Sequence, residues 1–202
     1  METSLADRTE LGADAHVVYD QRAEVPPQSA SRPAQRNVVL DAALGALAGA
    51  AGVWVMDKIG WSMYGREDDD ARRQEHEARV HGKDPAHVAV EKVAEMTGAP
   101  LPTEEPNPAG VAVHYGLGMI PGAMYGAARH EFPALRTGSG ALYGMGLFLT
   151  QDEVTAPLLG LASPPGDYPV EAHVRGLVSH VALGVVTETV LGLTDRVRSH
   201  GG

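Results

Sequence analysis

Four stretches of the chain are poor in charge, rich in small apolar residues and long enough to cross a lipid bilayer as helices. A membrane-spanning helix needs about 20 predominantly apolar residues, and the stretches that meet this need are residues 37–61, 110–128, 138–162 and 172–194. Lipid supplies little hydrophobic force between helices, so close packing through glycine and alanine takes its place. The sequence therefore predicts an all-α fold, a four-span transmembrane helical bundle with glycine-rich helix contacts.

The chain is polar before and between these stretches. Residues 1–36 hold Pro, Ser, Gln and charged residues without apolar periodicity, which is typical of a flexible tail. The segment 65–109 predicts a hydrophilic loop that is partly helical, because Asp84 followed by Pro85 is a helix start. We expect two parts, a tail and a membrane bundle that comprises residues 37–202.

Composition excludes several classes of function. The 202 residues include no cysteine, which rules out disulfides, thiolate catalysis and Cys-ligated metals. The formal net charge of -10 argues against a nucleic-acid partner, since phosphate binding needs clustered Lys and Arg. The acidic loop and its His76, His81 and His87 are interpreted as a solvated helical surface, and no site is assigned there. The chain carries no nucleotide-binding or nucleophile motif, so we expect a non-enzymatic protein.

Glycine recurs at every fourth position within the apolar stretches, and ionisable residues fall in the same rows. Residues four apart lie on one face of a helix, and a row of small residues is the face where membrane helices approach closely. The glycines predicted to make helix contacts are Gly45, Gly49, Gly118, Gly122, Gly126, Gly140, Gly144, Gly176, Gly184 and Gly192. The ionisable residues of these rows should therefore point toward neighbouring helices and away from lipid.

The same rows predict a polar cluster inside the bundle. In an up-and-down bundle one set of side chains falls in the same half of the bilayer: Asp57, His114, Asp152, Glu153 and His180. Glu188 belongs to the opposite half, one or two turns deeper along the fourth helix. Pro121 and Pro157 cannot donate backbone hydrogen bonds, so they free the carbonyls of Leu117 and Glu153 beside this cluster.

Three functional interpretations of this cluster stay open. The residues could carry or sense protons or small ions, because His and carboxylates change charge when burial shifts their pKa values. They could be structural hydrogen-bonding groups in an accessory or scaffolding subunit of a larger membrane complex or homo-oligomer. They could also hold a metal ion, although no stretch offers a His-x-x-x-His or Glu-x-x-His pair, and no other cofactor is expected.

Part of the chain resembles a known family. The segments "GALYG", "PLLGL" with Pro164 and Pro165 after it, and "GLVSHVALGVVTE" are similar to the YagU-like family of small bacterial inner-membrane proteins, over roughly residues 138–190. The resemblance implies a helical inner-membrane protein and supplies no catalytic residue. It also implies a histidine where this chain has Asp152, while His180 and Glu188 fall on similar polar positions.

The short loops set the expected orientation in the membrane. Cytoplasmic loops carry an excess of Lys and Arg, and the loop 129–137 has Arg129 and Arg136 whereas the loop 163–171 has neither residue type. With Arg196 and Arg198 after the fourth stretch, both termini are expected to be cytoplasmic. The resemblance to the YagU-like family implies a location in the bacterial inner membrane.

Overall fold

The computed structural model describes residues 37–100 and 106–200, and every regular element within these ranges is a helix. This confirms the all-α prediction. The tail predicted at residues 1–36 lies outside the described residues. The chain from Asn37 onward forms one compact unit.

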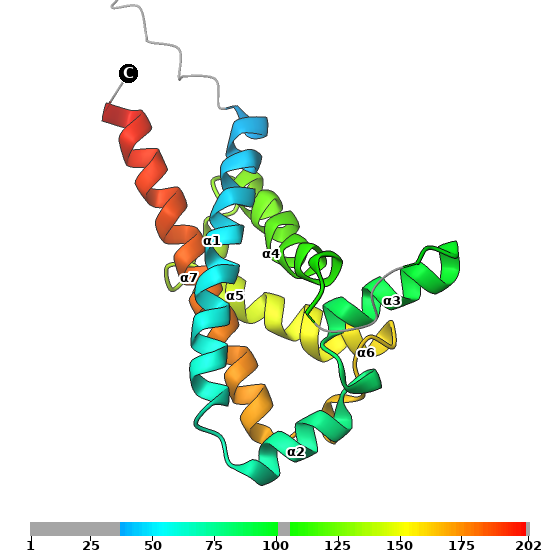
Figure 1. Ribbon diagram of the computed structural model, residues 1–202. Helices are drawn as coiled ribbons and strands as arrows, with labels where there is room; N and C mark the ends of the chain where they lie inside the picture. Colours follow the sequence, from blue (N-terminus) through cyan, green and yellow to red (C-terminus); the bar gives the residue numbers. More distant parts are fainter. Residues whose placement is uncertain (1–36, 101–105, 201–202) are drawn as a thin grey trace, which may run out of the picture. The chain divides into compact units, whose positions relative to one another are not determined.

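Three helices form the frame of this unit (Figure 1). Helix α1 packs against both α4 and α7, and glycine contacts show that it runs antiparallel to each of them. The side chain of Asn37 caps the start of α1 by accepting a hydrogen bond from the backbone N–H of Leu40 at 3.0 Å. The bounds of the three helices are α1 Val38–Tyr64, α4 Pro108–Ala128 and α7 Val170–His200.

The third predicted span is broken into pieces. It consists of α5 Ala141–Leu147, a π-helical segment η3 Phe148–Thr155 and the short α6 Ala156–Leu158. The backbone N–H of Ala156 bonds to the carbonyl of Gln151, five residues back. Pro157 follows directly. Because proline has no N–H to donate, it interrupts the α-helical hydrogen bonds, and the wider π turn lies just before this interruption.

Two helices of the described chain, α1 and α7, are long and apolar enough to cross a membrane, whereas the sequence prediction counted four. Helix α4 contains His114 together with tyrosines and several glycines, which lower its hydropathy. The third stretch fails because no single α-helix covers it. The prediction of four spans rested on length and on close packing through small residues, and such residues add little hydropathy.

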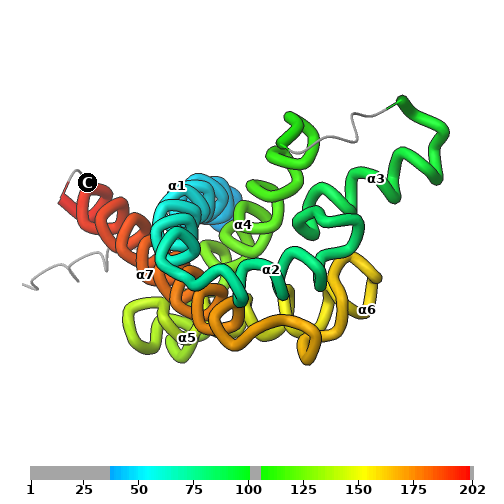
Figure 2. The backbone as a smooth tube through the Cα atoms, turned by 60° about the horizontal axis from the view of Figure 1, so that its bottom comes forward, coloured from blue at the N-terminus to red at the C-terminus, as the bar shows by residue number. Residues whose placement is uncertain are grey.

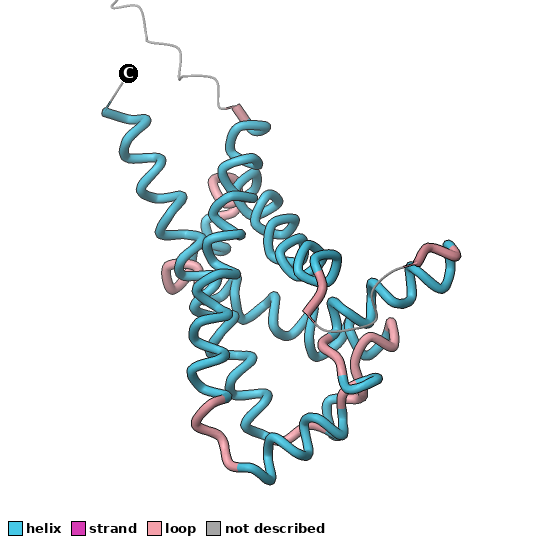
Figure 3. The backbone as a smooth tube through the Cα atoms, in the orientation of Figure 1, coloured by secondary structure: helices cyan, strands magenta, loops and turns pink. Residues whose placement is uncertain are grey.

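The hydrophilic loop folds back on the bundle. Its helices are joined by short turns (Figures 2 and 3), and α2 (Asp69–Ala78) leads from the end of α1 toward α3 (Pro85–Thr97) and α6. Asp84 caps α3, and Gly98 ends it with a left-handed backbone (φ 70°). Lys92 ties α3 to the third segment by donating to the carbonyl of Leu159 at 2.8 Å. The remaining short elements are η1 Val80–Gly82, η2 Pro133–Arg136 and η4 Pro165–Asp167.

Glycines line the seams between the long helices. A Cβ added to Gly45 would stand 2.2 Å from the carbonyl oxygen of Gly122, and one added to Gly184 would stand 2.3 Å from that of Gly140. No real Cβ comes that close, so α1 and α4, and likewise α5 and α7, touch backbone to backbone. Of the ten glycines predicted to make helix contacts, Gly192 alone has open space around the position of a Cβ.

The distribution of polar and apolar side chains is inverted relative to a water-soluble protein. The buried side chains include charged and polar groups such as Asp41, Arg129 and Glu188. Many large apolar side chains are exposed instead, among them Leu47, Trp54, Ile120, Met124, Leu149, Val174 and Val178. The apolar core between the helices is small and centres on Ala48, Tyr125 and Leu191.

Candidate functional site

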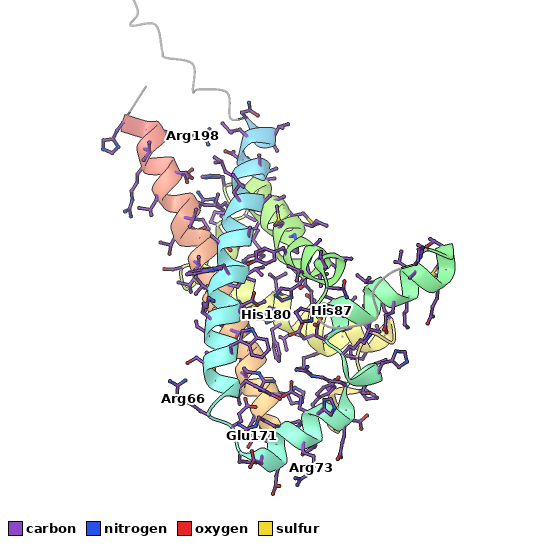
Figure 4. All side chains as sticks on the ribbon, viewed as in Figure 1. Arg66, Arg73, His87, Glu171, His180 and Arg198 are labelled. Carbon is purple, nitrogen blue, oxygen red and sulfur yellow. The ribbon has the colours of Figure 1, made fainter. Side chains whose placement is uncertain are left out.

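A cavity of about 860 Å³ lies where α1, α4, α7 and the π-helical segment meet the loop helices α2 and α3. Figure 4 shows His180 on α7 and His87 on α3 in this region, while the labelled Arg73 and Glu171 lie at the α2 end and Arg198 at the opposite end. The cavity is lined by five of the six residues predicted for the polar cluster, namely Asp57, His114, Asp152, Glu153 and His180. With His173, which also lines it, we call these six residues the cavity cluster.

Asp57 and His114 join α1 to α4. The Oδ1 atom of Asp57 lies 2.8 Å from Nε2 of His114, and each side chain exposes about a third of its surface. The two residues lie on the rows that hold Gly45, Gly49 and Gly118, which explains why they face each other across that seam. The pair is therefore a hydrogen-bonded dyad that remains open to the cavity.

The π-helical segment supplies three neighbouring side chains to the cavity. Gln151 donates through Nε2 to the carbonyl of Leu117 at 3.1 Å, which is the carbonyl that Pro121 leaves without its helical partner. The predicted free carbonyl is thus occupied by a side chain from another helix. The adjacent Asp152 and Glu153 both line the cavity and face different histidines of α7.

Glu153 and His173 must share a proton. Oε1 of Glu153 lies 2.7 Å from Nδ1 of His173, and the carbonyl oxygen of Pro165 lies 3.0 Å from Nε2 of the same ring. A carbonyl accepts only, so Nε2 carries a hydrogen, and a second hydrogen must lie between Nδ1 and the carboxyl group. The pair is either an imidazolium with a carboxylate or a neutral imidazole with a carboxylic acid.

Asp152 is the least satisfied member of the cavity cluster. Its Oδ2 lies 3.6 Å from Nδ1 of His180, but that nitrogen donates to the carbonyl of Gly176 at 2.9 Å. The part of the chain that the structure describes places no donor within hydrogen-bonding distance of this carboxyl group. The Asp152 side chain exposes 45% of its surface, and that surface lines the cavity.

His87 was missed by the sequence analysis, which interpreted the loop as solvated. Its side chain is buried and lines the cavity. The backbone N–H of Asn107 donates to Nε2 at 3.1 Å, so Nε2 accepts and Nδ1 holds the hydrogen that faces Asp84 at 2.5 Å. Gly110 packs directly on this imidazole. A glycine at this position was the only feature of the sequence that could have indicated a close contact there. His87 is therefore a neutral, fixed group in the wall.

His81 matches the solvated interpretation better. It is exposed and lies 3.0 Å from the carboxylate of Glu91, which also binds Lys83. The hydrogen bond from Lys83, followed by that from His81, holds the pKa of Glu91 below its usual value. This surface contact fixes the turn η1 against α3.

The two arginines of the cavity wall are already paired. Arg175 binds Glu75 at 2.6 Å and also binds Glu67, and its guanidinium lies 5.0 Å from the centre of the Tyr64 ring. Arg79 binds Glu75 from the other side at 2.8 Å. These permanent cations therefore neutralise Glu67 and Glu75, and the carboxyl groups of the cavity cluster are left with imidazoles as partners.

Glu188 lies apart from the cavity, in a network at the other end of α7. Its carboxylate accepts hydrogen bonds from Arg129 at 2.8 and 2.9 Å, from Arg136 at 2.7 Å and from Tyr125 at 2.7 Å. Arg129 exposes 1% of its side chain and binds Asp195 as well. We call these five residues the Glu188 network. Glu188, the sixth residue predicted for the polar cluster, therefore does not line the cavity.

The described residues contain no group of three or more His, Asp or Glu side chains that is placed to hold a metal ion. Asp152 and Glu153 each face a separate histidine, and Asp57 faces a third. The chemistry that the arrangement supports is the exchange of protons within separate pairs.

Comparison with known proteins found no match: no family model, no curated protein and no solved structure is similar to this chain at a significant level. The resemblance to the YagU-like family stays a prediction.

Proposed function

We propose that this chain is a multi-pass membrane protein whose cavity cluster takes up and releases protons. The observation that carries the proposal is the convergence of three carboxyl groups and three histidines on one cavity. Among the residues that the structure describes, no arginine or lysine pairs with any of the three acids. Ionisable groups inside membrane proteins mark proton and ion pathways by default. Histidine changes charge near neutral pH, so these pairs suit proton exchange.

The inverted surface supports the membrane part of the proposal. Leu47, Ile120, Leu149 and Val178 come from four different segments, and all expose large apolar side chains. In water such a surface would drive aggregation, whereas acyl chains cover it at no cost. The proposal places α4 and the third segment in the bilayer beside α1 and α7, because their polar groups face the seams and cavity.

The resemblance to inner-membrane proteins and the arginine-containing loop 129–137 support a bacterial inner-membrane location with both termini in the cytoplasm. In the described chain, Arg129 and Arg136 also bind Glu188. These two arginines therefore add positive charge to the loop and also neutralise a carboxylate of the bundle.

A scaffolding role is the rival proposal. It would need glycine faces left open to receive a helix from another chain. Nine of the ten predicted contact glycines are instead packed against this chain's own atoms, and this favours a self-contained cavity. The fully paired Glu188 network is the part of the molecule that fits a purely structural role.

The test is infrared titration of the purified full chain in lipid nanodiscs, between about pH 5 and pH 8, where histidine pairs change charge. Carboxyl stretching bands of the wild type should change across this range. Asp152→Asn and Glu153→Gln should each remove a band, and Asp70→Asn, an exposed acid on α2, should remove none. Identical titration spectra for the wild type and both cavity variants would refute proton handling. Release of the chain from vesicles by alkaline carbonate would refute the membrane assignment.

A further inference from the structure

We infer that the cavity binds an amphipathic organic cation, a protonated amine on an apolar body, with Asp152 as its counter-ion. The inference rests on the cavity of the proposed function and names the class of ligand that this cavity takes.

The size of the cavity points to a molecule and not to a bare ion. Its volume is about 860 Å³, within the range of roughly 300–1,000 Å³ typical of small-molecule sites. A metal ion with about six waters, at roughly 30 Å³ each, would fill only on the order of 200 Å³. The described residues also form no metal-ligand group. A ligand of molecular size fits this space better.

The charge of the cavity selects a cation. Glu75 is neutralised by Arg79 and Arg175, and His87 is neutral beside Asp84. Glu153 and His173 form a net neutral pair. The other lining acids, Asp57, Asp84 and Asp152, lie beside histidines and give the cavity its negative field. An anionic ligand would meet these carboxyl groups without a free arginine or lysine among the described lining residues to hold it.

Two polar groups in the wall lack hydrogen-bond partners. The first is the Asp152 carboxyl group, whose nearest histidine nitrogen is already used by the carbonyl of Gly176. The second is the hydroxyl of Ser179, which is buried, lines the cavity and has no partner in the described chain. The buried Ser179 hydroxyl is costly to leave without a partner, whereas the Asp152 carboxylate is exposed to the cavity and can accept a hydrogen bond from a ligand ammonium.

Apolar and aromatic side chains line much of the rest of the cavity. They include Val53, Met56, Tyr115, Leu117, Phe148 and Leu183. Aromatic faces attract cations and also cover hydrocarbon. An apolar body with one positive charge matches a wall of this kind, because the charge meets Asp152 and the body displaces water from the apolar surface.

The experiment measures binding of N,N-dimethylphenethylamine to the purified full chain in lipid nanodiscs at pH 7, by isothermal calorimetry. Its uncharged carbon isostere, (3-methylbutyl)benzene, is the ligand control. The expected result is binding of the amine at least tenfold tighter than the isostere. Asp152→Asn should weaken amine binding at least tenfold, and Asp70→Asn on the surface of α2 should leave it unchanged.

Equal affinity for the amine and its isostere would overturn the inference, and so would unchanged amine binding by a folded Asp152→Asn. If that variant fails to fold, the ratio of amine to isostere affinity in the wild type decides. The infrared titration above is made without amine, so it tests proton handling separately. Titration without amine binding would sink this inference alone, and amine binding without titration would sink the proposed function alone.

Discussion

The two ends of α7 hold polar groups in opposite states. In the Glu188 network every carboxylate oxygen of Glu188 has an arginine or tyrosine donor, and Arg129 is almost completely buried. In the cavity cluster the acids have histidines as partners, and Asp152 has no short hydrogen bond. Arginine keeps its charge at any physiological pH, whereas histidine does not. The Glu188 network is therefore built to keep its charges, whereas the cavity cluster is built to change its charge.

One seam connects both regions. Gly140 packs near Glu188, and Gly144 packs on the backbone of His180, so the contact between α5 and α7 runs from the Glu188 network to the cavity cluster. The acids at the two ends of α7 therefore differ in their hydrogen-bond partners, although one packed interface joins the two ends. Variants in both regions test this difference.

The largest effect is expected from Gly184→Leu. A side chain there would collide with the backbone of Gly140 and Gly144, so α5 should separate from α7 and both polar regions should be lost together. We expect no folded protein by gel filtration in detergent. Gly192→Leu is the control, because Gly192 has open space at the Cβ position. Normal assembly of Gly184→Leu would contradict the seam.

Arg129→Met should cost about 3 to 5 kcal/mol of unfolding free energy, because it leaves a buried carboxylate without its main cation. Arg136 would still face Glu188 but is 45% exposed. Denaturation in mixed micelles measures the loss. The double variant Arg129→Met with Glu188→Met should be more stable than Arg129→Met alone. A single variant as stable as the wild type would show that the Glu188 network is not structural.

Gln151→Leu should cost about 1 kcal/mol, the usual contribution of one hydrogen bond. It removes the donor to the Leu117 carbonyl and so loosens α4 from the π-helical segment at the cavity. The measurement is again denaturation in micelles, with Thr150→Val as control, because the Thr150 hydroxyl bonds within its own helix. An equal loss in both variants would refute a specific link across the cavity.

The smallest effect is expected at the loop, from Glu91→Gln, at about 0.5 kcal/mol. Lys83 and His81 lower the pKa of Glu91. A carboxyl group whose pKa is lowered on folding stabilises the fold above its ordinary pKa of 4.5, and the contribution disappears as the pH falls through the lowered value. The difference from wild type should therefore be present at neutral pH and absent in strong acid. Glu95→Gln, an exposed neighbour on α3, should show no difference at either pH.

The four-residue spacing predicted which helix faces meet, because a glycine row has only one face where backbones can touch. Asp57 and His114 lie in rows of this kind and pair as a result. The glycine spacing predicted the contacts between helices better than the number of membrane-spanning helices. Glycine allows helices to approach closely but does not raise their hydropathy. That is why α1 and α7 alone are apolar enough to cross a membrane among the described helices.

Other parts of the site depend on contacts between segments distant in sequence. His87 and Arg175 become part of the cavity only because α2 and α3 fold back on the bundle, and no local pattern in the loop marks this. His173 was within reach of sequence analysis, because it lies two helical turns before His180 on the same face of α7. A seven-residue spacing of histidines beside a glycine row was the signal that could have found it.

The π-helical segment Phe148–Thr155 carries a consequence for how this chain tolerates change in length. A turn closed over five residues uses one more residue than a turn closed over four, so the segment behaves like an α-helix with an insertion. Deleting one residue there would let the regular helix re-form and would rotate everything before the deletion relative to Pro157. Gln151, Asp152 and Glu153 would then face different neighbours. A deletion in this segment would therefore alter the cavity as much as a substitution of one of its lining residues.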